Sequence, residues 1–270
     1  MKIGIIGYGS MGKMILEKFI ETKTVDPSDL FVSNRTYAKI MDLNKIHPQL
    51  NICRNNSDAV KEVDMVFICV KPWEIKIVLS EIGNDIKDNC HIVSLNGSVL
   101  FKQLEQIGKN KKISKMIPSV MAEVNKSVTL ICHNTYVNYN DKTILKGLLE
   151  CFGTVTEVPE MEIGMGSELT SCMPGFIGAI FKVITDEAER HTTIPKEQIT
   201  QMVLETLYGT GTLLLEKGMS FDTLINRVAT RGGITEEGTK IIAEKLPEII
   251  KEMFEKTREK RSIITEKAQL

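Results

Sequence analysis

Residues 2–12 read KIGIIGYGSMG, an apolar run that leads directly into a turn with three glycines. The run at residues 2–6 is typical of a buried strand, and residues 10–21 carry apolar side chains at helical spacing. The glycines follow the pattern Gly-x-Gly-x-x-Gly. Between a strand and a helix, this pattern is typical of a loop that binds the phosphates of a dinucleotide.

Each glycine of this turn has its own physical reason. Gly7 permits a tight turn, Gly9 lets the backbone approach a pyrophosphate, and Gly12 lets the helix pack close to the strand. Amides at the start of the helix then face the anionic phosphates. We therefore expect the whole turn to bind the cofactor, through Gly7, Tyr8, Gly9, Ser10, Met11 and Gly12.

Downstream of this turn, apolar strands alternate with amphipathic helices. We expect strands at residues 30–33, 64–70, 91–95, 112–117, 127–132 and 154–158, and helices at 37–45 and 74–86. The run DMVFICV at residues 64–70 is continuously apolar, as in a parallel strand that is covered on both faces. Strands separated by helices form βαβ units, so the pattern predicts an α/β fold with a Rossmann-type, doubly wound, mainly parallel sheet.

Beyond Pro159 the pattern changes to long helices. They are expected at residues 164–190, 196–217, 221–228 and 235–257, with breaks at Pro195, Gly218 and the Gly232–Gly233 pair. Helix 196–217 has too little polar surface for a helix that stands alone in water. We therefore predict a nucleotide-binding domain at residues 1–159 and an all-helical dimerisation domain at 160–270.

The end of the second strand distinguishes NADP from NAD. Sites selective for NAD usually place Asp or Glu there, to bind the ribose 2′-hydroxyl. This chain has Asn34 and Arg35 instead. The guanidinium of Arg35 offers a forked donor to a 2′-phosphate, and Asn34 offers a neutral hydrogen bond. NADP is therefore favoured, with NAD as the open alternative.

Two further loops follow strands at the edge where parallel sheets bind ligands. Val70, Lys71 and Pro72 end the apolar run, and Lys71 is expected near the ribose or the nicotinamide. In the next loop, the small residues Asn96 and Gly97 would let the backbone approach the nicotinamide. A solvated surface lysine is the alternative for Lys71.

Composition narrows the class of protein. The chain has 270 residues and a net charge of -1, so it lacks the basic excess that nucleic acid binding requires. No apolar run is long enough to span a membrane, and strand-forming sequence begins at Lys2, which leaves no room for a signal peptide. The six cysteines and four histidines do not fall at metal-ligand spacings. We therefore expect no metal site, and a cytoplasmic protein with reduced thiols.

The chain resembles the pyrroline-5-carboxylate reductases, and among them the ComER-type variants, over essentially its whole length. The resemblance runs through the glycine turn, the Asn34-Arg35 pair, the Val70-Lys71-Pro72 loop and four later blocks. These blocks are Ile117-Pro118, Phe152-Gly153, Pro174 and RVATRGGIT at residues 227–235, which parallels the family's RVTSPGGTT.

This resemblance implies NAD(P)H-dependent reduction of a cyclic imine, 1-pyrroline-5-carboxylate, to L-proline in proline biosynthesis. It also implies that the C-terminal helices intertwine into a homodimer, which often assembles into a ring. The substrate's carboxylate and imine would be held by a loop at the dimer interface, with Thr230, Gly232, Gly233 and Thr235. Thr235 and Lys71 are the candidate catalytic residues.

The substrate half departs from the family pattern. Residues 170–176 read TSCMPGF where the family has SGSGPAY, and residues 117–121 read IPSVM where it has MPNTP. Met173, a candidate substrate contact, and Arg231 are bulkier than the family's residues. Glu236 and Glu237 follow Thr235. The imine that this chain reduces is therefore left open.

Three alternatives stay open from the sequence. Thr235 would also serve as the N-cap of the helix that follows it. A β-hydroxyacid dehydrogenase-like enzyme would use a lysine after the sheet, and Lys182 stands there with Asp186 in place of the usual asparagine. A non-catalytic, NADP-binding regulatory protein would keep the cofactor half and lose the chemistry.

Overall fold

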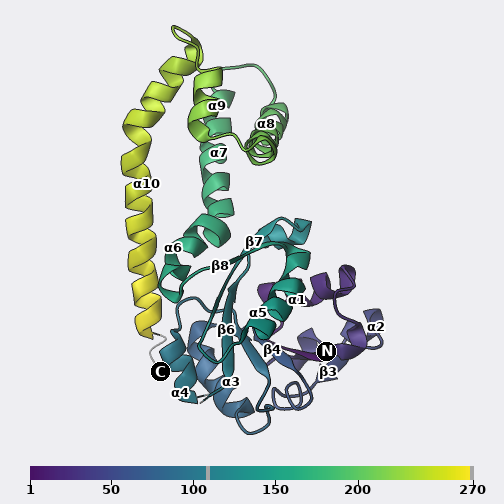
Figure 1. The fold of residues 1–270 in the computed structure, drawn as a ribbon. Helices are drawn as coiled ribbons and strands as arrows, with labels where there is room; N and C mark the ends of the chain where they lie inside the picture. The colour runs from purple at the N-terminus through teal and green to yellow at the C-terminus, as the bar shows by residue number, and fades with distance from the viewer. Residues whose placement is uncertain (108–109, 268–270) are drawn as a thin grey trace. The chain divides into compact units, whose positions relative to one another are not determined.

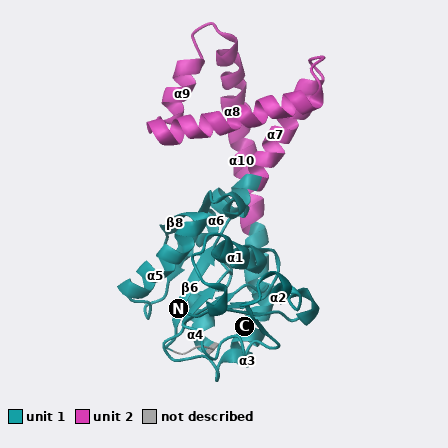
Figure 2. Ribbon diagram, turned by 90° about the vertical axis from the view of Figure 1, so that its right-hand side faces the viewer, with its two compact units in different colours: residues 1–174, 259–270 teal, residues 175–258 magenta. Residues whose placement is uncertain are grey.

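The computed structural model describes residues 1–107 and 110–267. Its contacts divide the chain into two compact units, residues 1–174 with 259–270, and residues 175–258 (Figure 2). Unit 1 thus includes helical residues that follow Pro159. The domain boundary at residues 159 and 160 stays a prediction.

Unit 1 is built on one sheet of eight strands in the order β3-β2-β1-β4-β5-β6-β7-β8. All neighbouring strands are parallel except β6 and β7, which are antiparallel. The predicted doubly wound, mainly parallel sheet is confirmed. Its strands are β1 (Ile3–Ile6), β2 (Leu30–Ser33), β3 (Asn51–Cys53), β4 (Met65–Ile68), β5 (His91–Ser94), β6 (Lys112–Ile117), β7 (Ser127–His133) and β8 (Gly153–Glu157).

Within unit 1, α-helices lie on both faces of the sheet (Figure 1). In unit 1 they are α1 (Ser10–Glu21), α2 (Leu43–Ile46), α3 (Ile75–Ile82), α4 (Phe101–Ile107), α5 (Tyr139–Leu149) and α6 (Ile163–Ser167). A π-helical segment, Glu168–Cys172, joins α6 to α7 (Met173–Glu189). The remaining helices are α8 (Lys196–Lys217), α9 (Phe221–Val228) and α10 (Ile234–Lys267).

Two apolar layers cover the sheet. On one face, Phe19 of α1 packs against Phe67 of β4 and Phe152, with ring centroids 5.7 and 5.5 Å away, and α5 contributes Leu145. On the other face, α3 and α4 pack their own buried side chains against the sheet. Burial on both faces explains why β1 and β4 are continuously apolar.

Some elements differ from the sequence prediction. The helix predicted at residues 37–45 is wrong: a 3₁₀ turn, Tyr37–Lys39, precedes the single turn of α2. Ile40 is buried there, but Tyr37 and Met41 are exposed, so the segment has no continuous apolar stripe to pack. The prediction also missed β3, α4 and α5. Since β3 has only three residues, it shows no readable alternation.

A buried polar line crosses β5, β6 and β7. His91 Nε2 lies 2.6 Å from Ser114 Oγ, which lies 2.6 Å from His133 Nδ1. Burial lowers the pKa of His91 to about 4, and it also lowers the pKa of His133. Among the described residues, His91 Nδ1 and His133 Nε2 have no hydrogen-bond partner.

Unit 2 has almost no core of its own. Among residues 175–258, all of which the structure describes, only Thr185 and Ile199 are buried. Gly218 at the end of α8 and Gly232 before α10 have φ of +59° and +76°, as the predicted breaks require. Large apolar side chains are exposed instead, among them Val183, Met202, Leu204, Tyr208, Leu215, Phe221, Ile241, Ile242 and Ile249.

Candidate functional site

Four loops leave the sheet at one edge, because the paired strands end in register. Ile6 is level with Ser33 and with Ile68, and Ile68 is level with Ser94. β1 has β2 on one side and β4 on the other, so the strand order reverses there. Open α/β sheets bind their ligands at such a switch point. The predicted cofactor residues of all four loops therefore come to one edge.

The glycine turn has the tight geometry that its sequence predicts. Gly7 has a φ of +98°, and a Cβ there would lie 2.7 Å from the carbonyl oxygen of Cys69. A Cβ on Gly12 would overlap the Gly7 carbonyl oxygen, so α1 can pack this closely only with glycine. Nothing lies within 4 Å of the Cβ position of Gly9, and no side chain caps α1. The amides at this helix start are open to an anion.

Asn34 connects the β2 loop to the glycine turn. Its Oδ1 accepts a hydrogen bond from the Tyr8 amide at 2.9 Å, and its Nδ2 donates to the Thr36 carbonyl at 2.9 Å. The Gly7 amide donates to the Ser33 carbonyl, also at 2.9 Å. The Asn34 side chain thus positions the turn, and its predicted contact with a 2′-phosphate stays a prediction.

Arg35 is paired with a residue that the sequence analysis did not single out. Its Nη1 lies 2.5 Å from Glu74 Oε1. The Arg35 side chain is 86% exposed, whereas that of Glu74 is 24% exposed. Glu74 is held in place at its other oxygen, which accepts a hydrogen bond from the Lys71 amide at 3.1 Å. A carboxylate therefore lies beside the arginine proposed for the 2′-phosphate.

The loops after β4 and β5 are joined at Asn96, which is 6% exposed. Its Nδ2 donates to the Val70 carbonyl at 3.0 Å. A Cβ on Gly97 would lie 3.0 Å from Ile163 Cγ2, so a larger residue would push the α6 side chain away by a few tenths of an ångström. The side chain of Lys71 is exposed, and Pro72 begins a 3₁₀ turn, Pro72–Glu74.

In the loop between α9 and α10, backbone amides donate hydrogen bonds to the loop itself and to the start of α10. The Gly233 amide donates to the Thr230 carbonyl at 2.9 Å, and the Gly232 amide donates to Glu236 Oε2 at 2.7 Å. The idea that Thr235 is the N-cap of α10 is wrong, because the helix begins at Ile234. This loop belongs to unit 2, whereas Met173, the first residue of α7, belongs to unit 1.

Glu168 is a second residue that the sequence analysis missed. It lies in the π-helical segment and is 1% exposed. Its Oε1 accepts a hydrogen bond from Arg261 at 2.5 Å, and its buried Oε2 has no partner among the described residues. The one signal in the sequence is a carboxylate among small and apolar residues, GMGSELTSC.

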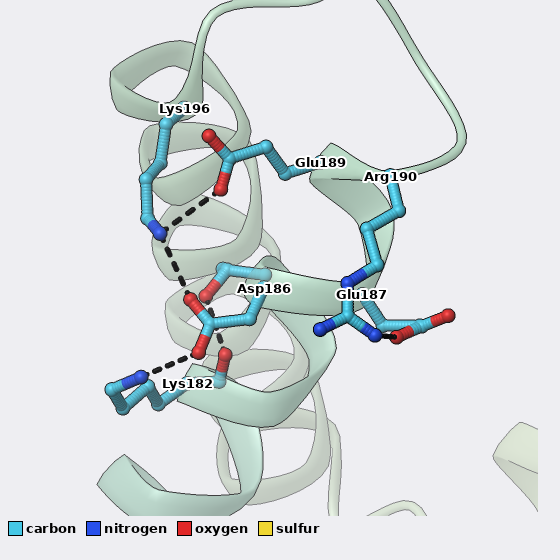
Figure 3. A network of polar contacts seen from close by, with 7 residues as sticks. Lys182, Asp186, Glu187, Glu189, Arg190 and Lys196 are labelled. Carbon is cyan, nitrogen blue, oxygen red and sulfur yellow. Dashed lines mark hydrogen bonds and ion pairs between the residues drawn. The ribbon is translucent and has the colours of Figure 1, made fainter.

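Lys182 belongs to an ion-pair network in unit 2 (Figure 3). It pairs with Asp186, whose other oxygen lies 2.9 Å from Lys196 Nζ. Hydrogen bonds from both lysines lower the pKa of Asp186 to about 2. Since the Lys182 side chain is 74% exposed and already paired, this arrangement does not favour the dehydrogenase alternative.

No group of three or more His, Cys, Asp or Glu side chains suited to a metal ion occurs within residues 1–107 and 110–267. In the part of the chain that the structure describes, no helix is both long and apolar enough to cross a membrane. All six cysteines are free thiols.

Two protein families match different parts of the chain. Residues 2–97 match the family described as NADP oxidoreductase coenzyme F420-dependent. Residues 160–263 match the family described as pyrroline-5-carboxylate reductase dimerisation. The first match covers strands of the sheet, and the second covers the long helices of the C-terminal half.

Individual proteins match nearly the whole chain. Pyrroline-5-carboxylate reductase 3 of Bacillus subtilis is 34% identical over 266 residues, which cover 98% of this chain and 97% of that protein. ComE operon protein 4 of the same organism is 28% identical, over 95% and 94%. The structure of Plasmodium falciparum pyrroline carboxylate reductase with NADP bound has the same fold, with a TM-score of 0.81, 20% identity, and coverage of 99% and 97%. The chain therefore belongs to the pyrroline-5-carboxylate reductase family.

Proposed function

We propose that this chain is an NADPH-dependent reductase that converts 1-pyrroline-5-carboxylate to L-proline. The observation that carries the proposal is the open glycine turn at the switch point, with Arg35 where an NAD-selective site would have an acid. Two relatives that match over 98% and 90% of this chain are named pyrroline-5-carboxylate reductase. NADPH-dependent reduction of this cyclic imine is therefore the function that the cofactor site and the names of the relatives support together.

The chain's residues divide the work of holding the cofactor. The open amides around Gly9 would bind the pyrophosphate, and Arg35 would bind the 2′-phosphate. The Val70–Pro72 loop and the Asn96–Gly97 loop would line the remainder of the cofactor, with the Lys71 ammonium near its ribose or nicotinamide. When bound, NADPH supplies the hydride.

The substrate would be held chiefly by the loop between α9 and α10. The Thr235 hydroxyl would hydrogen-bond the imine nitrogen, and the Gly232 and Gly233 amides and Thr230 would bind the carboxylate. Met173 would contact the ring. A protonated imine is already electrophilic, so positioning accounts for most of the catalysis. Because the Gly232 amide now donates to Glu236 and the Gly233 amide to the Thr230 carbonyl, both hydrogen bonds have to open before these amides bind a substrate carboxylate.

Assembly is part of the proposal. The exposed apolar side chains of unit 2 and the match to a dimerisation family support a homodimer formed through the helical half. A ring of such dimers would be the further step. As part of the same proposal, we place the protein in the cytoplasm.

The test is an assay of the full chain with NADPH and 1-pyrroline-5-carboxylate. NADPH oxidation with stoichiometric L-proline is expected. Thr235→Ala should lower turnover and Thr235→Ser should be mild, since Ser keeps the hydroxyl. Tight NADPH binding with no turnover on this or any related cyclic imine would instead support the regulatory alternative.

A further inference from the structure

The adenosine end of the cofactor site contains two opposite charges from different loops. Arg35 follows β2, and Glu74 follows β4 through the 3₁₀ turn Pro72–Glu74. Their contact, Nη1 to Oε1 at 2.5 Å, joins residues 39 positions apart in the chain. An acid that NAD-selective sites carry at the end of the second strand is thus supplied here from another strand.

We propose that Glu74 is a specificity-determining residue. Its carboxylate weakens the binding of NADPH relative to NADH, so it makes this site less selective for NADPH. The inference rests on the proposed function, because it takes Arg35 as the residue that binds the 2′-phosphate. Glu74 then competes with that phosphate for the guanidinium and repels its negative charge. Toward NADH, the same carboxylate accepts a hydrogen bond from the 2′-hydroxyl.

The two side chains differ in how firmly they are held. Glu74 is partly buried, and its Oε2 accepts from the Lys71 amide at 3.1 Å, while the Glu74 amide donates to the Lys71 carbonyl at 2.9 Å. Arg35 is 86% exposed, and its side chain is long. When a nucleotide binds, Arg35 is therefore the residue that moves, and Glu74 keeps its charge at the site.

Because Glu74 lies so close to Arg35, a 2′-phosphate has to compete with its carboxylate for the guanidinium. If the pair stays intact, a phosphate oxygen that binds Arg35 lies near Glu74 Oε1; if Arg35 moves toward the phosphate, the ion pair is lost. A 2′-phosphate carries about two negative charges, so it is repelled by the carboxylate, whereas a neutral hydroxyl is not. Exposed charges are screened by salt, which keeps the effect moderate and makes it depend on ionic strength.

The chain carries its own probe for this measurement. Trp73 is the single tryptophan, it is adjacent to Glu74, and it is 57% exposed. Its fluorescence should be quenched by a bound reduced nicotinamide nucleotide, which gives Kd values without any need for turnover. The comparison uses the full chain, Glu74→Gln, Arg35→Ala and Glu62→Gln. Glu62 is the matched control, since it pairs with Lys2 at the opposite end of β1.

Glu74→Gln keeps an oxygen for the Lys71 amide but removes the charge. The substitution should lower the Kd for NADPH by about three- to tenfold, and it should leave the Kd for NADH unchanged or raise it. The gain should shrink at high salt, while Glu62→Gln should leave both Kd values unchanged. Arg35→Ala should weaken NADPH far more than NADH.

An unchanged ratio of the two Kd values in Glu74→Gln, or weaker NADPH binding with an unaltered melting curve, would overturn the inference. If the unmodified chain binds NADPH and makes proline, that failure leaves the proposed function standing. If the unmodified chain binds neither nucleotide, both the inference and the proposed function fail.

Discussion

At the scale of single residues, the Gly232 amide already has an anionic partner. Glu236 accepts from it at 2.7 Å and lies in the first turn of α10, where the helix dipole favours a negative charge. We predict that Glu236→Gln lowers the KM for 1-pyrroline-5-carboxylate by several-fold, because an internal competitor for the amide loses its charge. Steady-state kinetics with Glu237→Gln as control would check this. Glu237 shares Lys240 with Glu236, at 2.7 and 3.8 Å, but of the two it is Glu236 that accepts from the Gly232 amide. A raised or unchanged KM in Glu236→Gln would contradict it.

His91 gives the fold a pH dependence. Its pKa is lowered from 6.5 to about 4 by burial, so the unfolded chain binds a proton in this range and the folded chain does not. Stability should therefore be complete above pH 6.5 and fall as the pH drops toward 4, by up to about 3 kcal/mol. Urea unfolding from pH 7.5 to 4 measures this. His91→Gln should flatten the profile, whereas His191→Gln, at an exposed site, should not.

At the scale of elements, one partly buried ion pair joins α10 to the π-helical segment, with a buried carboxylate and an arginine that is 29% exposed. Arg261 donates to Glu168 at 2.5 Å, and a Cβ on Gly164 would overlap its guanidinium. Arg261→Met should lower the free energy of unfolding by about 3 kcal/mol, because it leaves a buried carboxylate unpaired. Adding Glu168→Gln should restore part of that loss.

The control for this experiment is an exposed pair. Arg190 and Glu187 are 2.8 Å apart, with side chains 73% and 55% exposed. Arg190→Met should cost less than about 1 kcal/mol in the same urea titration. Equal losses for the two arginine variants would show that Glu168 remains solvated when Arg261 is gone.

The elements also show how far the sequence alone could go. Long apolar runs such as β4 and the glycine turn were predictable, because their signals are local. Glu74 and Glu168 were not, since their partners lie 39 and 93 residues away along the chain. The same applies to the antiparallel pairing of β6 with β7, which depends on the path of the turn at residues 118–126 and not on either strand's pattern. Helix α5 has many polar residues, so its apolar side chains give only a weak helical periodicity, and the sequence did not predict it.

At the scale of the whole molecule, the helical unit cannot account for its own stability. Two buried side chains among residues 175–258 are too few to offset the entropy of ordering four helical segments. If a second copy covers the exposed apolar residues, the melting temperature should rise with protein concentration over about a hundredfold range. Calorimetry together with analytical ultracentrifugation would check this. A monomer at micromolar concentration, or a melting temperature independent of concentration, would refute the homodimer.

The buried line of His91, Ser114 and His133 has a direction. The Ser114 hydroxyl has one hydrogen and a ring nitrogen 2.6 Å away on either side, so it donates to one ring and accepts from the other. If it donates to His133 Nδ1, the His133 hydrogen lies on Nε2, which faces Glu157 Oε2 at 3.9 Å. The reverse order would place the hydrogen on His91 Nδ1. Both of these nitrogens lack a hydrogen-bond partner among the described residues, and each ring has a carboxylate that acts on its charge, Asp141 for His91 and Glu157 for His133. In either order the two neutral rings carry their hydrogen on the same kind of nitrogen, Nε2 in one order and Nδ1 in the other, so the tautomers of His91 and His133 are coupled through one serine hydroxyl across three strands.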